Sequence, residues 1–184
     1  MNYLVTGLIC SGKSTFLDIA KKYDFDTIKS DDIVSSLYND ESIVHEIEKH
    51  LDINQSKENL EMIVKKLFFR SKKNREIIEA IFHPVVHKII INRLEISQNL
   101  MVELPPIINN YELFQKYRSI YIHTGREMRI KRFNERNSYN ADFDKINAIQ
   151  NDFELIKDVC DLVICNDGNT DSLNKHFEKG IIKK

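Results

Sequence analysis

The stretch of sequence that decides the fold lies near the start of the chain and reads Gly7-Leu8-Ile9-Cys10-Ser11-Gly12-Lys13-Ser14. It fits the pattern G-x-x-x-x-G-K-[ST], in which a glycine-rich loop leads into a helix and binds phosphate. The preceding run, Tyr3 to Thr6, is typical of a short β-strand, and apolar residues recur at helical spacing from Lys13 to Tyr23. Strand, loop and helix therefore follow in the order that this pattern requires.

The residue types in this loop suit the binding of a nucleotide triphosphate. Glycines let the backbone curl so that successive N–H groups converge on phosphate oxygens at a helix N-terminus. We expect every residue from Gly7 to Thr15 to contribute to ATP binding, with Lys13 pairing with the β- and γ-phosphates and the Ser14 hydroxyl binding Mg²⁺. Leu8 and Ile9 are bulkier than the small residues usual in such loops.

Length and composition bound the class of protein. The chain has 184 residues, which suits a single domain over residues 1–184. Its 27 basic residues nearly balance its 28 acidic ones, which gives no support to bulk binding of nucleic acid or acidic membranes. No apolar run approaches the ~20 residues that a membrane-spanning helix needs, and the N-terminus shows no signal-peptide pattern. We expect a soluble, cytoplasmic protein.

Four more apolar runs are typical of β-strands, and helical patterns separate them. The runs lie at residues 25–28, 100–104, 119–123 and 162–165. Residues 42–98 are mainly helical in pattern, and Pro84 predicts a break or kink within that segment. Strands separated by helices favour right-handed crossovers and a mostly parallel sheet with helices on both faces. The predicted fold class is a three-layer α/β/α arrangement.

Carboxylates near two strand ends are candidates for catalysis and metal binding. Asp31 and Asp32 follow the second strand, and the carboxyl ends of parallel strands face the ligand crevice of such sheets. A carboxylate there can accept the proton of an acceptor hydroxyl. The alternative, that both residues only cap the next helix, carries more weight for Asp32 than for Asp31. Glu103, near the end of the third strand, is a candidate for holding Mg²⁺ directly or through water. An unpartnered carboxylate is costly to bury within an apolar strand, and this cost favours a functional role for Glu103.

A basic helix follows the fourth strand and is a candidate lid over the phosphates. Its basic residues are Arg126, Arg129, Lys131, Arg132 and Arg136. Helical spacing places Arg129, Arg132 and Arg136 on one face. That face could close over a nucleotide or could be an ordinary solvated surface. His83, beside Pro84, could contact a substrate or be a core histidine.

Taken together, these motifs resemble the dephospho-CoA kinase family. The features that agree in order and spacing are the phosphate loop, Ser30-Asp31, His83-Pro84, the strand Val102-Glu103-Leu104-Pro105 and the tail from Asp161 to Gly168. Many nucleotide kinases share the loop, whereas the later combination is much more particular. The resemblance covers roughly residues 1–180.

The resemblance implies a fold and a reaction. The fold would be adenylate-kinase-like, with a five-stranded parallel core, a helical substrate-binding part at about residues 42–98 and a lid at about residues 126–157. The reaction would be the phosphorylation of the ribose 3′-hydroxyl of dephospho-CoA by ATP with Mg²⁺, the last step of coenzyme A synthesis. ATP and dephospho-CoA are the partners that this reaction implies.

The resemblance also assigns roles by position. Asp31 would be the catalytic carboxylate that activates the acceptor hydroxyl, beside Lys13 at the phosphates. The other residues implied in binding are His83, Glu103 and Pro105 for the substrate, and Arg132, Arg136 and Asn166 for the nucleotide.

Several positions depart from the family pattern. Asn109 stands where an acid is usual, Asn137 stands where Asp is expected, and Phe153 and Ile156 stand where the lid commonly carries basic residues. Two alternatives therefore stay open. One is a kinase of another small-molecule or nucleoside acceptor, and the other is a nucleotide-binding regulatory protein with weakened catalysis.

Overall fold

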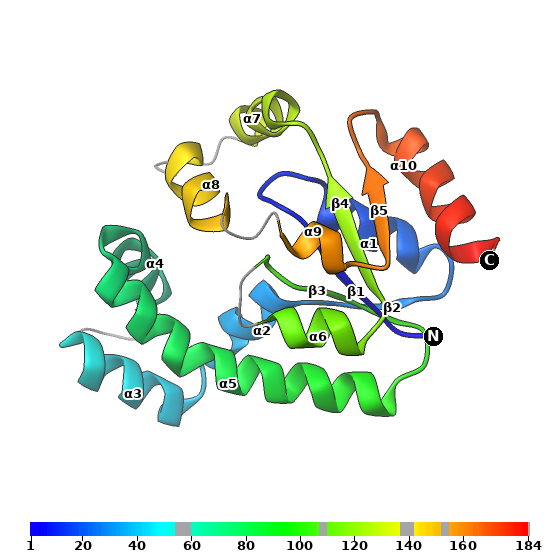
Figure 1. The fold of residues 1–184 in the computed structure, drawn as a ribbon. Coiled ribbons are helices and arrows are strands. Elements are labelled where there is room, and N and C mark those ends of the chain that lie inside the picture. Colours follow the sequence, from blue (N-terminus) through cyan, green and yellow to red (C-terminus); the bar gives the residue numbers. More distant parts are fainter. Residues whose placement is uncertain (54–59, 107–109, 137–141, 152–154, 184) are drawn as a thin grey trace. The chain divides into compact units, whose positions relative to one another are not determined.

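The structure is a computed structural model that describes residues 1–53, 60–106, 110–136, 142–151 and 155–183 (Figure 1). The sequence departures at Asn109, Asn137 and Phe153 lie outside these residues. The chain divides into two compact units, one made of residues 1–29 with 97–184 and the other of residues 30–96. Within the described residues, all β-strands belong to the first unit.

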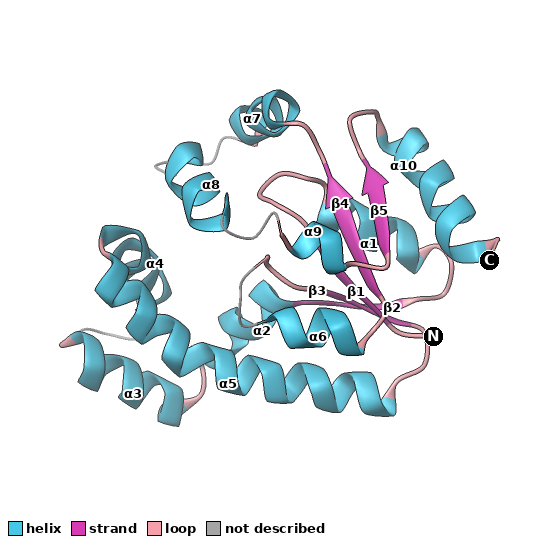
Figure 2. Cartoon of the chain, in the orientation of Figure 1, coloured by secondary structure: helices cyan, strands magenta, loops and turns pink. Residues whose placement is uncertain are grey.

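The first unit is built on a parallel β-sheet of five strands (Figure 2). The strands are β1 (Tyr3–Thr6), β2 (Asp26–Lys29), β3 (Leu100–Glu103), β4 (Ser119–His123) and β5 (Leu162–Cys165). Their order is β2-β3-β1-β4-β5, and every neighbouring pair is parallel. The predicted α/β fold with a parallel sheet is confirmed. Because β2 and β3 lie on one side of β1 and β4 and β5 on the other, the chain changes direction across the sheet at β1, where open sheets of this kind bind ligands.

Helices cover both faces of this sheet. Those of the first unit are α1 (Lys13–Lys21), α6 (Tyr111–Lys116), α7 (Arg126–Glu135), α8 (Phe143–Asn151), α9 (Ile156–Val159), α10 (Thr170–Phe177) and the π-helix η3 (Glu178–Ile182). Helix α1 packs against α10 on one face, and α6 packs against α9 on the other (Figure 1). Helix α6 has no recognisable pattern in the sequence, because its six residues are too few to show a helical period.

The core beneath α1 and α10 follows from the alternation of side chains along the strands. Tyr3 and Val5 of β1 face the same side, because successive strand residues point to opposite faces. They pack with apolar residues of α1 and α10, among which the rings of Phe16 and Phe177 lie 5.1 Å apart. Leu4, between Tyr3 and Val5, is fully buried outside this cluster. Burial on both faces makes β1 a fixed support for the loop that follows it.

The second unit is helical. It consists of α2 (Ser30–Leu37), α3 (Glu41–Leu51), α4 (Leu60–Arg70) and α5 (Lys72–Ile96). Asp40 caps α3 by accepting a hydrogen bond from the Ser42 amide, and a side-chain cap of this kind stabilises a helix by about 1 kcal/mol. Helix α5 contacts α2, α3 and α4, and is therefore the axis of the unit. No helix in the described ranges combines the length and the apolarity that crossing a bilayer requires.

Helix α5 runs through Pro84 without a break, so of the predicted break or kink the break was wrong. Proline removes the hydrogen bond to the carbonyl of Ala80, four residues earlier, but both residues lie on the exposed side of the helix, where water can reach that carbonyl. On the opposite side the buried residues recur every four positions: Ile78, Phe82, Val86, Ile90 and Leu94. Packing along this stripe offsets the cost of one lost hydrogen bond.

His83 links the stability of this unit to pH. Burial, and to a lesser extent the neighbouring His87, lowers the pKa of His83 from 6.5 to about 4. The folded chain therefore favours the neutral imidazole, whereas the unfolded chain is protonated as pH falls through 6.5. The contribution of His83 to the free energy of unfolding is fully present above pH 6.5 and is lost as pH falls towards 4.

We predict that His83→Gln weakens this pH dependence. Between pH 7.5 and pH 5 the wild type should lose about 1–2 kcal/mol more unfolding free energy than the variant, after allowance for the partial exposure of the ring. Urea unfolding at the two pH values measures the difference. His50→Gln, at an exposed histidine of α3, is the matched control and should behave as the wild type. An identical loss of stability in His83→Gln and wild type would contradict the prediction.

Candidate active site

The phosphate loop has a backbone that only particular residues can adopt. Gly7 has φ 148° and Gly12 has φ 100°, both in the region that side chains disfavour. A Cβ atom on Gly7 would collide with the carbonyl oxygen of Ile122 on β4, and one on Gly12 with the side-chain amide of Asn166. The two glycines of the sequence pattern therefore stand at the two places where the backbone curls and lies closest to its neighbours.

Three donors from outside the loop converge on the carbonyl oxygen of Ser11. They are Asn166 Nδ2 at 2.8 Å, Thr124 Oγ1 at 2.9 Å and Arg132 Nη1 at 3.4 Å. In a trans peptide the N–H of the next residue points away from the carbonyl. Because the Ser11 carbonyl is held towards these donors, the amide of Gly12 points in the opposite direction, as a phosphate site at this helix N-terminus requires.

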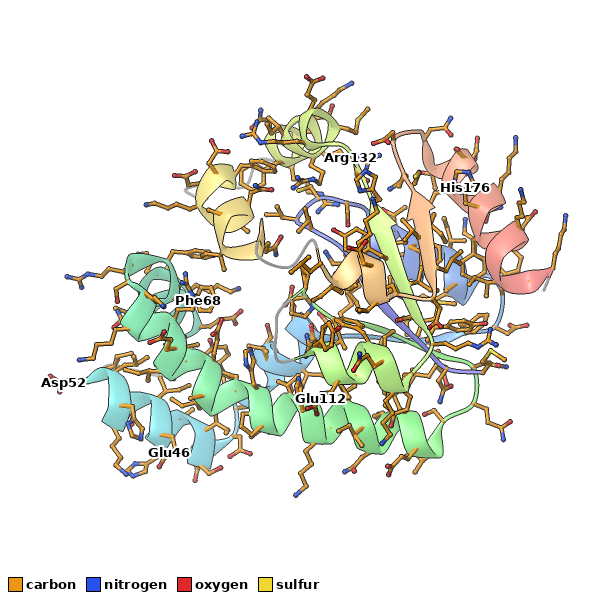
Figure 3. The ribbon with its side chains drawn as sticks, viewed as in Figure 1. Glu46, Asp52, Phe68, Glu112, Arg132 and His176 are labelled. Atoms are coloured by element: carbon orange, nitrogen blue, oxygen red, sulfur yellow. The ribbon has the colours of Figure 1, made fainter. Side chains whose placement is uncertain are left out.

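Arg132 has a structural role that the sequence did not reveal. Its second terminal nitrogen, Nη2, donates to the carbonyls of Asn166 at 2.8 Å and Gly168 at 3.2 Å. Figure 3 shows Arg132 reaching from α7 towards the ends of β4 and β5. The guanidinium thus joins the phosphate loop to the segment after β5. A contact between Arg132 and the nucleotide stays a prediction.

Lys13 lies at the centre of the loop. Its ammonium group donates to the carbonyls of Gly7 at 2.9 Å and Leu8 at 3.3 Å, and it lies 3.9 Å from Glu103 Oε1. The side chains of Lys13 and Glu103 are both mostly buried. The lysine cation is therefore positioned inside the curl of the loop, where the β- and γ-phosphates are expected.

Ser14 and Glu103 form the oxygen pair that the sequence assigned to Mg²⁺. The Ser14 hydroxyl donates to Glu103 Oε2 at 3.2 Å. The pair forms because the register places Glu103 opposite Val5, at the strand end from which the loop leaves. Mg²⁺ prefers oxygen ligands and usually takes one or two from protein and the rest from phosphate and water. The two side chains therefore fit the ion.

Several other polar or predicted residues lie in the loop or beside it. Within the described residues, the buried hydroxyls of Ser11 and Thr6 have no hydrogen-bond partner. Buried polar atoms without partners are rare, and an ordered water is a common partner of such groups. Thr15 lies in the first turn of α1, next to Ser14. Pro105 follows β3 closely, and its carbonyl accepts a hydrogen bond from Asn110 Nδ2 at 2.9 Å.

The arginines of α7 do not share one environment. Arg129 is buried, donates to Asn147 Oδ1 of α8 at 2.8 Å and lies over the Phe143 ring, whereas Arg136 is exposed at the end of α7. Helical spacing grouped these residues, but it could not reveal that Arg129 joins α7 to α8. Nothing in the sequence indicated Asn147 as the partner of Arg129, because a single asparagine in a helix can have many different roles.

The remaining predicted residues belong to the second unit. Asp31 and Asp32 are exposed in the first turn of α2, where negative charge is favourable. Asp31 lies two residues after Lys29, the last residue of β2, and Lys29 is opposite Glu103 in the register of β2 and β3. His83 is half-buried on α5, with its ring stacked 6.2 Å from that of His87.

The sequence profile of the dephospho-CoA kinase family matches residues 3–172. The chain belongs to this family. It is therefore a kinase, and the reaction of the family is the phosphorylation of dephospho-CoA by ATP in the last step of coenzyme A synthesis. A dephospho-CoA kinase of Helicobacter hepaticus is 26% identical over 186 residues, covering 95% of this chain and 88% of its relative.

Solved structures agree with the fold. A dephospho-CoA kinase from Campylobacter jejuni has a TM-score of 0.69 at 24% identity and covers 99% of this chain and 96% of its own. A shikimate kinase from Acinetobacter baumannii has a TM-score of 0.59 at 17% identity and covers 100% of this chain and 94% of its own. At these identities the likeness concerns the fold of phosphate-loop kinases.

We predict that Gly12→Ala damages both the loop and the fold. The added Cβ meets the Asn166 amide at a φ of 100°, which should cost about 1–3 kcal/mol of unfolding free energy and greatly weaken nucleotide binding. Gly125→Ala is the control, because its φ is −57° and its Cβ would meet nothing closer than 3.5 Å. Urea unfolding and calorimetric titration with MgADP measure both effects. Equal behaviour of the two variants would contradict the assignment.

Arg132→Lys should weaken the loop although it keeps the positive charge. A lysine cannot reproduce the two-nitrogen fork that reaches the carbonyls of Ser11, Asn166 and Gly168. We expect a loss of about 1–3 kcal/mol of unfolding free energy and a raised KM for ATP. Lys131→Ala, on the exposed side of α7, should change stability by less than about 0.5 kcal/mol. Wild-type stability in Arg132→Lys would show that the charge alone matters.

Proposed function

We propose that this chain performs the dephospho-CoA kinase reaction with the ATP triphosphate held on residues 7–15 and with Asp31 activating the ribose 3′-hydroxyl. The observation that carries the proposal is the Ser11 carbonyl held by donors from Asn166 and Thr124, which turns the Gly12 amide away from those donors, to the side where the triphosphate would lie. Family membership supports the reaction, and this geometry supports the place of the triphosphate.

The cations and amides of the loop would neutralise the negative charge that builds up on the phosphates. Lys13 would exchange its hydrogen bonds to the Gly7 and Leu8 carbonyls for the β- and γ-phosphate oxygens. Donors that are positioned before the reaction stabilise charge without reorganisation, and this is usually the largest contribution to catalysis. Arg136 and Asn166 are proposed nucleotide contacts, and Arg132 would act both on the loop and on the nucleotide.

Mg²⁺ would be held by Ser14 and Glu103, and it would neutralise phosphate charge when bound. The hydrogen bond from Ser14 to Glu103 keeps the hydroxyl and the carboxylate oriented towards each other. Glu103 also lies 3.9 Å from the Lys13 ammonium, so a single carboxylate would help to position both cationic groups of the site. Among the described residues, no group of three or more His, Cys, Asp or Glu suits a metal, which fits an ion shared with phosphate.

Asp31 would take the proton of the acceptor in the transfer step. A bond forms between the ribose 3′-oxygen and the γ-phosphorus, the bond from that phosphorus to the ADP oxygen breaks, and the hydroxyl proton passes to the Asp31 carboxylate. The carboxylate is exposed in the first turn of α2 and is therefore accessible to a substrate. His83 of α5 and Pro105 after β3 are proposed contacts of dephospho-CoA.

We predict that Asp31→Asn lowers kcat by about 10²–10⁴-fold, because the amide cannot accept the proton, and leaves the affinity for MgADP nearly unchanged. Asp32→Asn, one residue further along α2, should retain most activity. The assay follows ADP release and the mass of CoA from ATP and dephospho-CoA, with a nucleoside panel as alternative acceptors. Loss of activity in Asp32→Asn alone would move the role to Asp32, and turnover of another acceptor alone would overturn the proposed substrate.

A further inference from the structure

The tip of the phosphate loop is held by the two helices that follow β4. Cys10 packs with Phe133 of α7 and Phe143 of α8, whose rings lie 5.5 Å apart in an edge-to-face arrangement. Ile9, Ile130 and Ile146 complete this apolar cluster. Ile9, one of the two bulky side chains that set this loop apart from the usual small-residue pattern, therefore has a partner surface on α7 and α8.

A hydrogen bond from α8 reaches the same tip. The amide of Ile9 donates to the side-chain oxygen Oε1 of Gln150 at 2.7 Å, across 141 positions of sequence. The Gln150 side chain is half-buried, so this bond is partly shielded from water. The amide of Ser11, two residues later, is instead bonded inside the loop to the Leu8 carbonyl at 3.1 Å. The loop tip thus has one internal anchor and one anchor on α8.

Cys10 has an unusual backbone conformation, which these contacts stabilise. Cys10 has φ 58°, in the left-handed region that a residue with a side chain seldom occupies. Such a backbone persists only where its surroundings over-determine it. The apolar cluster holds the Cys10 side chain, and Gln150 holds the peptide on the other side of Ile9. Burial raises the pKa of the Cys10 thiol despite four nearby cations, so the group packs as an apolar side chain.

We propose that Gln150 is a positioning residue for nucleotide binding, which fixes the tip of the phosphate loop through the Ile9 amide and so couples helix α8 to the bound nucleotide. The proposal rests on residues 7–15 being the triphosphate site. Coupling of this kind is reciprocal: if α8 sets the affinity of the loop for nucleotide, nucleotide must in turn stabilise the contact with α8. A glutamine that only stabilised the fold would leave nucleotide affinity unchanged.

The test compares Gln150→Met, which keeps the length of the side chain and removes the acceptor, with Gln115→Met at an exposed position of α6. Calorimetric titration should show about 5–20-fold weaker MgADP binding in Gln150→Met, the fold-change typical of one lost hydrogen bond, and no change in Gln115→Met. In steady-state assays KM for ATP should rise while kcat stays within about twofold.

Hydrogen exchange of the Ile9 amide, followed by NMR, tests the contact itself. Exchange should be slow in wild type, at least about tenfold faster in Gln150→Met, and slow again in Gln150→Glu, which keeps an acceptor oxygen. MgADP should slow the exchange further in wild type.

The two measurements separate the inference from the proposed function. MgADP binding within twofold of wild type in Gln150→Met would overturn the inference alone. A wild-type protein that does not bind MgADP would overturn the triphosphate site and the inference with it. Fast Ile9 exchange in wild type would remove the contact on which the inference depends.

Discussion

A single carbonyl oxygen, that of Ser11, is the point on which the site depends. Asn166, Thr124 and Arg132 donate to it from three segments that are distant in sequence. With that carbonyl held, the following amide points away from these donors, and the close approach of Asn166 explains why Gly12 has no side chain. The phosphate loop is therefore a local sequence motif whose conformation is maintained by non-local contacts.

The parts of the molecule that the sequence predicted are those with strong local signals. The loop from Gly7 to Ser14 carries its own pattern, and the apolar runs that became β1 to β5 alternate with helices in an order typical of parallel sheets. The dephospho-CoA kinase resemblance rested on motifs in order, and the family match over residues 3–172 confirmed it. In each case the information lies within a few consecutive residues or in their sequence order.

The parts that the sequence did not predict depend on contacts between distant segments. The break expected at Pro84 is absent because the proline lies on the exposed side of α5, and exposure is a property of tertiary packing. Arg129 pairs with Asn147 through side chains, and the Ile9 backbone amide donates to the Gln150 side chain, and neither pair shares a sequence pattern. The arginines of α7, which look alike in sequence, therefore differ in their contacts once α7 and α8 pack together.

The register of the central strand has a consequence for synthesis of the chain. Strand β1 pairs with β3 and β4, whose residues lie roughly a hundred positions further along: Tyr3 is opposite Met101, and Leu4 is opposite Ser119. A nascent chain emerging from a ribosome must therefore carry its first strand unpaired until more than half of the protein has been translated, and Asn166 emerges later still. Contacts of such long sequence separation slow folding and expose apolar segments to aggregation. The phosphate loop thus reaches its final conformation only late in the life of a nascent chain.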